Sequence, residues 1–236
     1  MAGAQGNPTD QVGLVFVSHS ALIAAGLVEL ARQMAPTVTL VAAGGRDDGG
    51  IGTSFDLIVA GIAEADRGAG AVVLCDLGSA ILTAETALDF LDDAVRPRVQ
   101  IADAPLVEGG VAAAVAAEIG GDLAAVVAAA ESARSTPPSA DDASGAAEPE
   151  RSEVSRTVIL RNRDGLHARP AADFVKLAST FDAPVSVNGR DAHSLLGIMS
   201  LGLTRGMSVE ISGPDERSRA AVDALADLIE TGFGEE

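Results

Sequence analysis

The chain has 236 residues, which exceeds the usual length of one domain and favours two. Its formal net charge of -18 at pH 7 argues against nucleic acid as a partner and disfavours anionic membrane surfaces, because both are bound through clustered Lys and Arg. Hydrophobic residues make up 47% of the chain but aromatic residues only 3%, so its cores must be built from Ala, Val, Leu and Ile.

The first thirteen residues, MAGAQGNPTDQVG, lack the basic flank and the long apolar core of a signal peptide. No run in the sequence reaches the ~18 apolar residues that a transmembrane helix needs. We therefore expect a cytoplasmic protein that is not inserted in a membrane.

Short apolar runs alternate with segments of helical periodicity through the first half of the chain. Near-continuous Val, Leu and Ile in each run is typical of strands in a parallel sheet that is covered on both faces. In chain order these strands and helices span residues 11–18, 21–35, 38–45, 54–67 and 70–77. The pattern predicts an α/β domain with a doubly wound, mostly parallel sheet. Cys75 falls within the last run, which indicates a buried, structural thiol.

A helix over 79–93, a strand over 98–103 and a helical pattern over 108–132 complete this domain, which we place at residues 1–130. Residues 131–153 are rich in Pro, Ser, Ala and acidic residues and contain no large apolar side chain. Such a segment cannot bury enough surface to offset its ordering entropy, so it is predicted to be a flexible linker.

Residues 154–236 have a different organisation. The pattern predicts strands at 157–162, 184–189 and 208–212, long amphipathic helices at 167–181 and 217–232, and a short helix at 194–202. This order favours a smaller α+β domain, an open-faced sandwich in which the helices pack on one face of an antiparallel sheet.

His19 follows the first predicted strand in the segment VSHS and directly precedes a helix. In open α/β sheets, ligand sites form in the crevice beyond the carboxyl ends of the strands. Gly44 and Gly45 stand where the second strand ends and the next loop begins, and we expect their backbone N–H groups to be free for phosphate. After the third strand, Asp76 is placed to orient an imidazole and Ser79 to donate a hydrogen bond. Capping the next helix is the alternative role of Asp76.

His167 lies in GLHARPA, after the turn RDG and at the start of a helix. A helix N-terminus presents unpaired N–H groups and attracts anions, and the guanidinium of Arg169 can bind phosphoryl oxygens. A neutral imidazole is a competent nucleophile at physiological pH, and a phosphoryl group bound to it stays transferable. His167 is therefore a candidate phosphoryl carrier, with helix capping as the alternative role.

Residues 154–236 resemble the phosphocarrier protein HPr of the phosphoenolpyruvate-dependent phosphotransferase system, in NRDGLHARPAADFVKLAS, HSLLGIMSLGLTRG and the ending LIETGFGE. The resemblance implies that enzyme I phosphorylates His167, on Nδ1, and that Arg169 steadies the phosphate. Ser194 matches the regulatory serine of that family, although His193 stands where the family often has Lys. Whether a kinase acts on Ser194 is open, and capping of the short helix is its alternative role.

Residues 11–130 resemble the phosphotransferase subunit of bacterial phosphoenolpyruvate-dependent dihydroxyacetone kinase, whose first domain is akin to mannose-type enzyme IIA. The segments that carry this resemblance are VSHS, AAGG, GTS, DLGSA and APLVEGGVAAAV. The resemblance implies a homodimer through this domain and phosphorylation of His19 on Nε2. Some members of the family carry an enzyme I-like domain after these two. The sequence ends at Glu236 without one, so we expect no direct acceptance from phosphoenolpyruvate.

The two resemblances together predict a phosphotransferase component that relays phosphoryl groups from enzyme I to His167 and then to His19. The final acceptor would be ADP held by the ADP-binding subunit of the kinase, with dihydroxyacetone bound by another subunit. Whether the transfer between histidines is intra-chain or inter-chain is open. Two alternatives stand beside it: a carrier for a mannose-type sugar permease, against which DLGSA speaks, and a regulatory phospho-sensor.

Metal chemistry is not expected, because the three histidines are scattered along the sequence and the one Cys lies in an apolar strand. We expect no cofactor, and Mg²⁺ would be needed only by the partners. His193 has no matching ligand in the sequence and is expected to be exposed and incidental.

Overall fold

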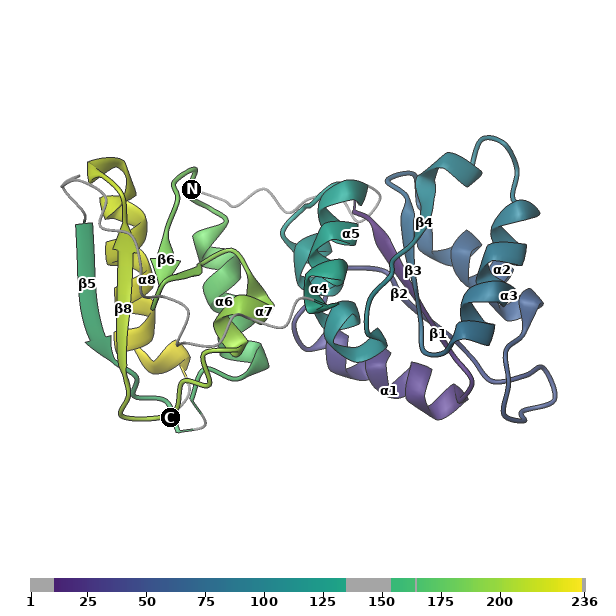
Figure 1. Cartoon of the computed structure of the whole chain (residues 1–236), viewed down its shortest axis with the longest axis horizontal. Helices are drawn as coiled ribbons and strands as arrows, with labels where there is room; N and C mark the ends of the chain where they lie inside the picture. Colours follow the sequence, from purple (N-terminus) through teal and green to yellow (C-terminus); the bar gives the residue numbers. More distant parts are fainter. Residues whose placement is uncertain (1–10, 135–153, 164, 235–236) are drawn as a thin grey trace. The chain divides into compact units, whose positions relative to one another are not determined.

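The computed structural model describes residues 11–134, 154–163 and 165–234. The chain divides after residue 135 into two units, each with its own sheet (Figure 1). The first unit has a parallel sheet and the second an antiparallel one. This arrangement confirms the predicted fold class, a parallel α/β unit followed by an α+β unit.

The first unit is doubly wound around a sheet of order β2-β1-β3-β4, in which all three strand pairs are parallel. In Figure 1, α2 and α3 cover one face of this sheet while α1, α4 and α5 cover the other. Its strands and helices are β1 (Gly13–Ser18), α1 (Ala21–Arg32), β2 (Leu40–Gly44), α2 (Phe55–Ala65), β3 (Ala71–Cys75), α3 (Gly78–Asp89), β4 (Val99–Ile101), α4 (Leu106–Glu118) and α5 (Leu123–Glu131).

Strand β1 lies in the middle of the core because successive side chains point to opposite faces of the sheet. Val15 and Val17 belong to the apolar cluster that includes Ile58 and Ile62 of α2. Phe16 lies on the other face, 3.0 Å from where a Cβ on Gly110 of α4 would stand. Since β1 is covered on both faces and buried along its whole length, the chain first becomes accessible to solvent just after the carboxyl end of the strand.

The helical pattern predicted over 108–132 is interrupted, and the structure forms the separate helices α4 and α5 there. Gly120 adopts a left-handed φ of 87°, which ends α4. The side chain of Asp122 then accepts a hydrogen bond from the Ala125 N–H (2.9 Å) and caps α5. Helix α5 runs into the predicted linker as far as Glu131 and is followed by a 3₁₀ turn over Ser132–Arg134. The rest of that linker lies outside the described residues.

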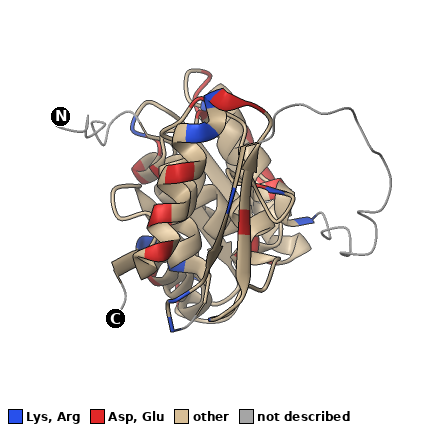
Figure 2. Cartoon of the chain, turned by 90° about the vertical axis from the view of Figure 1, so that its left-hand side faces the viewer, with Lys and Arg blue, Asp and Glu red and all other residues tan. Residues whose placement is uncertain are grey.

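The second unit has the strand order β5-β8-β6-β7 with antiparallel pairing throughout. Buried Phe174 of α6, Ile211 of β8, and Leu225 of α8 are among the side chains of its core. Figure 2 shows the Asp and Glu residues of the described chain in red, several of them along one helix. Its elements are β5 (Val154–Ile159), α6 (Ala168–Ala178), β6 (Ser186–Val187), β7 (Arg190–Asp191), α7 (Leu195–Met199), β8 (Ser208–Gly213) and α8 (Arg219–Glu230).

Candidate functional site

His19 stands at the carboxyl end of β1, in the two-residue connection to α1. Strands β2 and β3 flank β1 on either side, and the chain leaves β1 toward one face of the sheet and β3 toward the other. The sequence predicted His19 at this strand end, and the structure adds that it is the switch point at which open α/β sheets form ligand crevices. The imidazole is half-buried, with 21% of its side-chain surface exposed, so it is held in place but still accessible.

Asp76, the residue after β3, binds His19 at two points. Its Oδ1 lies 2.9 Å from His19 Nδ1, and its Oδ2 accepts the backbone N–H of His19 at 2.9 Å. The Ser18 hydroxyl donates to Oδ2 (2.9 Å) and the Leu77 N–H to Oδ1 (2.7 Å). Burial alone would raise the pKa of Asp76, but these hydrogen bonds outweigh it and hold the pKa below its usual value. Asp76 is therefore a fixed carboxylate at neutral pH.

The carboxylate of Asp76 determines which nitrogen of His19 can react. An ionised carboxylate only accepts hydrogen bonds, so Nδ1 of His19 must carry the ring proton. In the neutral ring Nε2 then holds the lone pair, and it lies 2.7 Å from Ser79 Oγ, whose hydroxyl can donate to it in this tautomer. The arrangement presents a nucleophilic Nε2 at the site surface, with a carboxylate ready to stabilise positive charge on the ring.

The amides of Gly78 and Ser79, the first two residues of α3, have no intrahelical acceptor because of their position. Leu77 occupies the N-cap position and has no side chain that could cap the helix. Because the Ser79 hydroxyl lies 2.7 Å from His19 Nε2, this end of α3 is next to that nitrogen, and its dipole and free amides are suited to an anion.

Gly44, the last residue of β2, and Gly45, which follows it, have roles different from the one predicted. A Cβ on Gly44 would stand 2.7 Å from both Ala24 Cβ and the Ser20 carbonyl, so this glycine lets α1 pack closely against β2. Gly45 has a left-handed φ of 79°, and its N–H donates to the Ser18 carbonyl at 3.0 Å. The prediction that the Gly45 amide is free for phosphate is therefore wrong.

Two contributors to the site were missed in the sequence. Ser18 is fully buried and binds Asp76, and the N–H of Gly52 donates to the His19 carbonyl at 2.9 Å. A serine that ends an otherwise apolar strand was the available signal for Ser18. No local pattern indicated Gly52, because its role depends on how the loop between β2 and α2 folds back over β1.

Cys75 directly precedes Asp76 and is a free cysteine whose side chain is buried. Burial, reinforced by the charges of Asp76 and Glu85, raises the pKa of its thiol to about 12. The thiol is therefore protonated and buried at neutral pH, as expected for a structural cysteine.

In the second unit, His167 is the N-cap residue of α6 and is exposed. The turn before it is fixed by Gly165, whose φ is 72°, and by a hydrogen bond from the Leu166 N–H to the Leu203 carbonyl (2.8 Å). Arg169 is also exposed, in the first turn of the same helix. The structure thus brings an imidazole, a guanidinium and the amides of a helix N-terminus to one place on the surface.

Ser194 caps helix α7, since its hydroxyl oxygen accepts a hydrogen bond from the Gly197 N–H at 3.1 Å. We expect Ser194→Ala to lower the free energy of unfolding by about 1 kcal/mol, the usual contribution of an N-cap. Urea unfolding followed on NMR amide signals of the second unit measures this change. Exposed Ser208 is the matched control, and Ser208→Ala should stay within about 0.5 kcal/mol of wild type. An equal effect of both substitutions would show that the cap contributes nothing.

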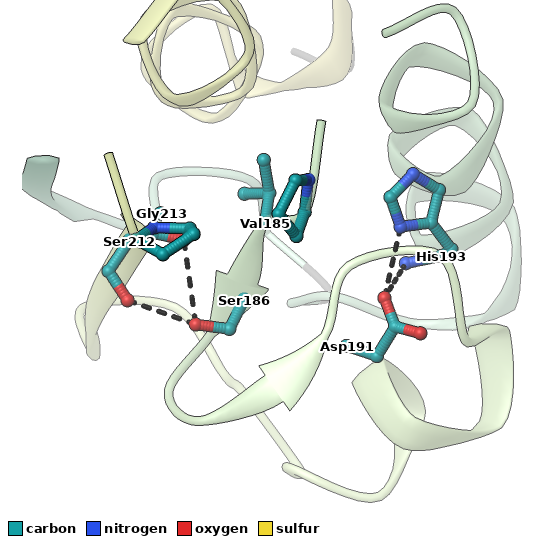
Figure 3. Close-up of a pocket in the computed structure, with 8 residues that line it drawn as sticks. Val185, Ser186, Asp191, His193, Ser212 and Gly213 are labelled. Atoms are coloured by element: carbon teal, nitrogen blue, oxygen red, sulfur yellow. Dashed lines mark hydrogen bonds and ion pairs between the residues drawn. The ribbon is translucent and has the colours of Figure 1, made fainter. Parts of the chain in front are cut away.

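His193 was predicted to be exposed and incidental, but it is partly buried and has a hydrogen-bond partner. It lines a surface pocket together with Asp191, whose Oδ1 lies 3.0 Å from His193 Nδ1 and accepts the His193 backbone N–H at 2.9 Å (Figure 3). Across this pocket, the hydroxyls of Ser186 and Ser212 are hydrogen-bonded to each other at 2.9 Å. The prediction overlooked Asp191 as a partner only two residues away.

The part of the chain that the structure describes contains no group of three or more His, Cys, Asp or Glu side chains placed to hold a metal ion. None of the helices in this part is both long enough and apolar enough to cross a membrane.

Two models of known families match different parts of the chain. A family model described as "PTS system fructose IIA component" matches residues 13–127, and one described as "PTS HPr component phosphorylation site" matches residues 154–231. The first match contains His19, Asp76 and Ser79, and the second contains His167 and Arg169.

Curated relatives match both halves. The phosphoryl donor subunit DhaM of the PEP-dependent dihydroxyacetone kinase of Pantoea ananatis is 35% identical over 237 residues, which cover 91% of this chain and 50% of that protein. A DhaM of Listeria innocua is 44% identical over 44% of this chain and 84% of its own length. The phosphocarrier protein HPr of Haloferax volcanii is 39% identical over 33% of this chain and 94% of its own length.

Among solved structures, the protein of unknown function EF1359 is 36% identical and has a TM-score of 0.50, with 53% of this chain and 97% of that chain covered. This chain spans about half the length of the first curated relatives that it matches.

Proposed function

Because the chain belongs to the family of DhaM phosphoryl donor subunits of PEP-dependent dihydroxyacetone kinase, we propose that it carries phosphoryl groups on two histidines. Enzyme I phosphorylates His167 on Nδ1, and the group then passes to Nε2 of His19. The last acceptor is ADP held by the ADP-binding subunit of the kinase, which phosphorylates dihydroxyacetone. The chain is thus a phosphotransferase component that works in the cytoplasm and forms a homodimer through its first unit.

The observation that carries this proposal is the geometry at His19. Asp76 fixes the ring proton on Nδ1, and Nε2 is left with its lone pair at the surface. Phosphoryl transfer needs positioning and electrostatic stabilisation more than acid-base chemistry, and this site supplies both. Among the described residues, no group of three or more His, Cys, Asp or Glu is placed to hold a metal ion.

The transfer from His167 to His19 needs no further reactant. The lone pair of His19 Nε2 attacks phosphorus and forms the new N–P bond. The N–P bond on His167 breaks, and its electron pair stays on the His167 nitrogen. His19 keeps its proton on Nδ1 and becomes a phosphoimidazolium, whose positive charge the Asp76 carboxylate stabilises. The Ser79 hydroxyl must then turn from Nε2 to a phosphoryl oxygen.

The surface around His19 supports a protein as the acceptor. Four large apolar side chains there are exposed by 60% to 85%. They are Leu22 in the first turn of α1, Ile51 beside Gly52, Leu77 beside Asp76, and Leu82 one turn beyond Ser79. Exposed apolar side chains gathered at one site mark a protein-interaction surface, which a carrier that serves a kinase subunit requires.

A reconstituted kinase reaction tests the proposal. The chain, enzyme I, phosphoenolpyruvate, the ADP-loaded kinase subunits and dihydroxyacetone should yield many molecules of dihydroxyacetone phosphate per chain, measured by ³¹P NMR. His193→Ala is the matched control and should react at the wild-type rate. Transfer to a mannose-type permease domain, with none to the kinase, would identify a permease carrier. Phosphorylation of the histidines without product formation would identify a phospho-sensor.

A further inference from the structure

Phosphorylation of His19 creates electrostatic repulsion that the contacts of the site in the described structure do not offset. A phosphoryl group on His19 adds about two negative charges close to the Asp76 carboxylate, in a chain whose net charge is already -18. The hydrogen bonds and ion pairs of His19 in the described structure involve Asp76, Ser79, Gly52 and no Lys or Arg. A nearby cation would therefore favour the phosphorylated form.

The loop between β2 and α2 brings one arginine to this site. It is tied to the β1–α1 junction at both ends, by the N–H of Gly45 on the Ser18 carbonyl (3.0 Å) and the N–H of Gly52 on the His19 carbonyl (2.9 Å). Between these anchors, the Arg46 N–H donates to the Gly50 carbonyl at 3.0 Å. The loop therefore holds Arg46 close to the backbone of His19.

The side chain of Arg46 packs against Gly52, whose backbone N–H binds the His19 carbonyl. A Cβ on Gly52 would stand 2.8 Å from both Cγ and Cδ of Arg46, so the aliphatic stem occupies the space that this glycine leaves open. The guanidinium is bound by Asp48, with Nη2 and Oδ2 2.8 Å apart. Both partners are more than half exposed, at 57% and 61%, and such a pair contributes only about 0.2–1 kcal/mol. A phosphoryl dianion can therefore compete for this guanidinium.

The other arginines of the first unit lie elsewhere. Arg46 is the one Lys or Arg in the loops that follow β1, β2 and β3, all of which are described. Arg32 ends α1, Arg67 follows α2, and a 3₁₀ turn with Arg96 and Arg98 precedes β4, which places these four at the opposite edge of the sheet. Arg134 pairs with Asp103 beyond the outer strand β4.

The geometry points to Arg46 as a phosphate-binding residue that releases Asp48 and binds the phosphoryl oxygens when His19 is phosphorylated. This inference rests on the proposed function of His19. The inference also explains the glycines at positions 49, 50 and 52. They let the loop fold back and leave room for the aliphatic part of the Arg46 side chain to pack against the loop. Asp48 holds the guanidinium beside the site until the phosphoryl group arrives.

The test measures how phosphate is shared between the two histidines at equilibrium. The full chain is incubated with enzyme I and less than one equivalent of phosphoenolpyruvate per chain, so that each phosphoryl group can distribute between the two histidines. Enzyme I is then removed, and the phosphohistidine signals are integrated by ³¹P NMR at pH 8. Arg46→Gln should lower the ratio of phospho-His19 to phospho-His167 by about tenfold, the effect of losing one charge-assisted hydrogen bond. Arg46→Lys should restore part of the loss, and Asp48→Asn should not lower the ratio.

Arg67→Gln at the opposite edge of the sheet is the matched control and should leave the ratio unchanged. Far-UV circular dichroism on heating verifies that each variant is folded. An Arg46→Gln ratio equal to that of wild type would overturn the inference while the proposed function stands. Absence of phosphate from His19 in the wild-type chain would instead overturn the proposed function itself.

Discussion

Replacement of His167 by alanine is expected to leave the chain without acid-labile phosphate after incubation with enzyme I and phosphoenolpyruvate. The wild-type chain should gain two phosphoryl groups and His19→Ala only one. The reason is the order of the relay: His167 lies exposed at a helix N-terminus, whereas His19 is half-buried against Asp76 and receives its group from His167. Intact-mass spectrometry at neutral to alkaline pH, where phosphohistidine survives, measures the number of groups.

His193→Ala is the matched control for these two variants, because His193 is bound to Asp191 in the pocket of the second unit. It should gain two phosphoryl groups like the wild-type chain. A phosphoryl group on His19 in the His167→Ala variant would contradict the order of the relay, since it would require direct transfer from enzyme I. One group in both histidine variants would show two independent acceptors in place of a relay.

The alternation of apolar runs and helical periods was sufficient to predict the fold of both units. Strand β1 illustrates why: its residues are apolar on both faces, which only a sheet covered on both sides accommodates. The break between α4 and α5 was missed because Ala-rich sequence on both sides of Gly120 has high helix propensity. A glycine in such a segment is tolerated within a helix about as readily as it ends one.

At the site, the prediction placed His19, Asp76 and Ser79 on one sheet edge, and the structure puts them within hydrogen-bonding distance. That inference needed only the rule that carboxyl ends of parallel strands meet at one edge. The Gly45 amide was misjudged because its partner, the Ser18 carbonyl, belongs to the neighbouring strand. Hydrogen bonds between loops depend on strand register and loop closure, which periodicity does not encode. The catalytic roles themselves stay predictions until the transfer is measured.

Asp76→Asn is expected to slow phosphorylation of His19 by about 100-fold or more, because an amide neither fixes the ring proton on Nδ1 nor stabilises the phosphoimidazolium. In the wild-type chain, the oxygens of the Asp76 carboxylate accept four hydrogen bonds, from the His19 ring and backbone, from Ser18 and from Leu77. An asparagine has one acceptor oxygen, so the variant should also lose about 2 kcal/mol of stability while staying folded. Quenched-flow transfer from phospho-His167, followed by mass spectrometry, measures the rate.

The stability difference between wild type and Asp76→Asn should depend on pH in one direction. Because the folded-state pKa of Asp76 is lowered, its stabilisation is fully present above the unfolded-state pKa of about 3.9. That stabilisation is lost as the pH falls through the folded value. Urea unfolding at pH 7 and pH 3, followed on amide signals of the first unit, should therefore show a difference that shrinks at pH 3. Exposed Asp93 is the control, and Asp93→Asn should match wild type at both pH values.

A transfer rate for Asp76→Asn equal to that of wild type would show that Asp76 has only a structural role, in connecting β3 to the loop of His19.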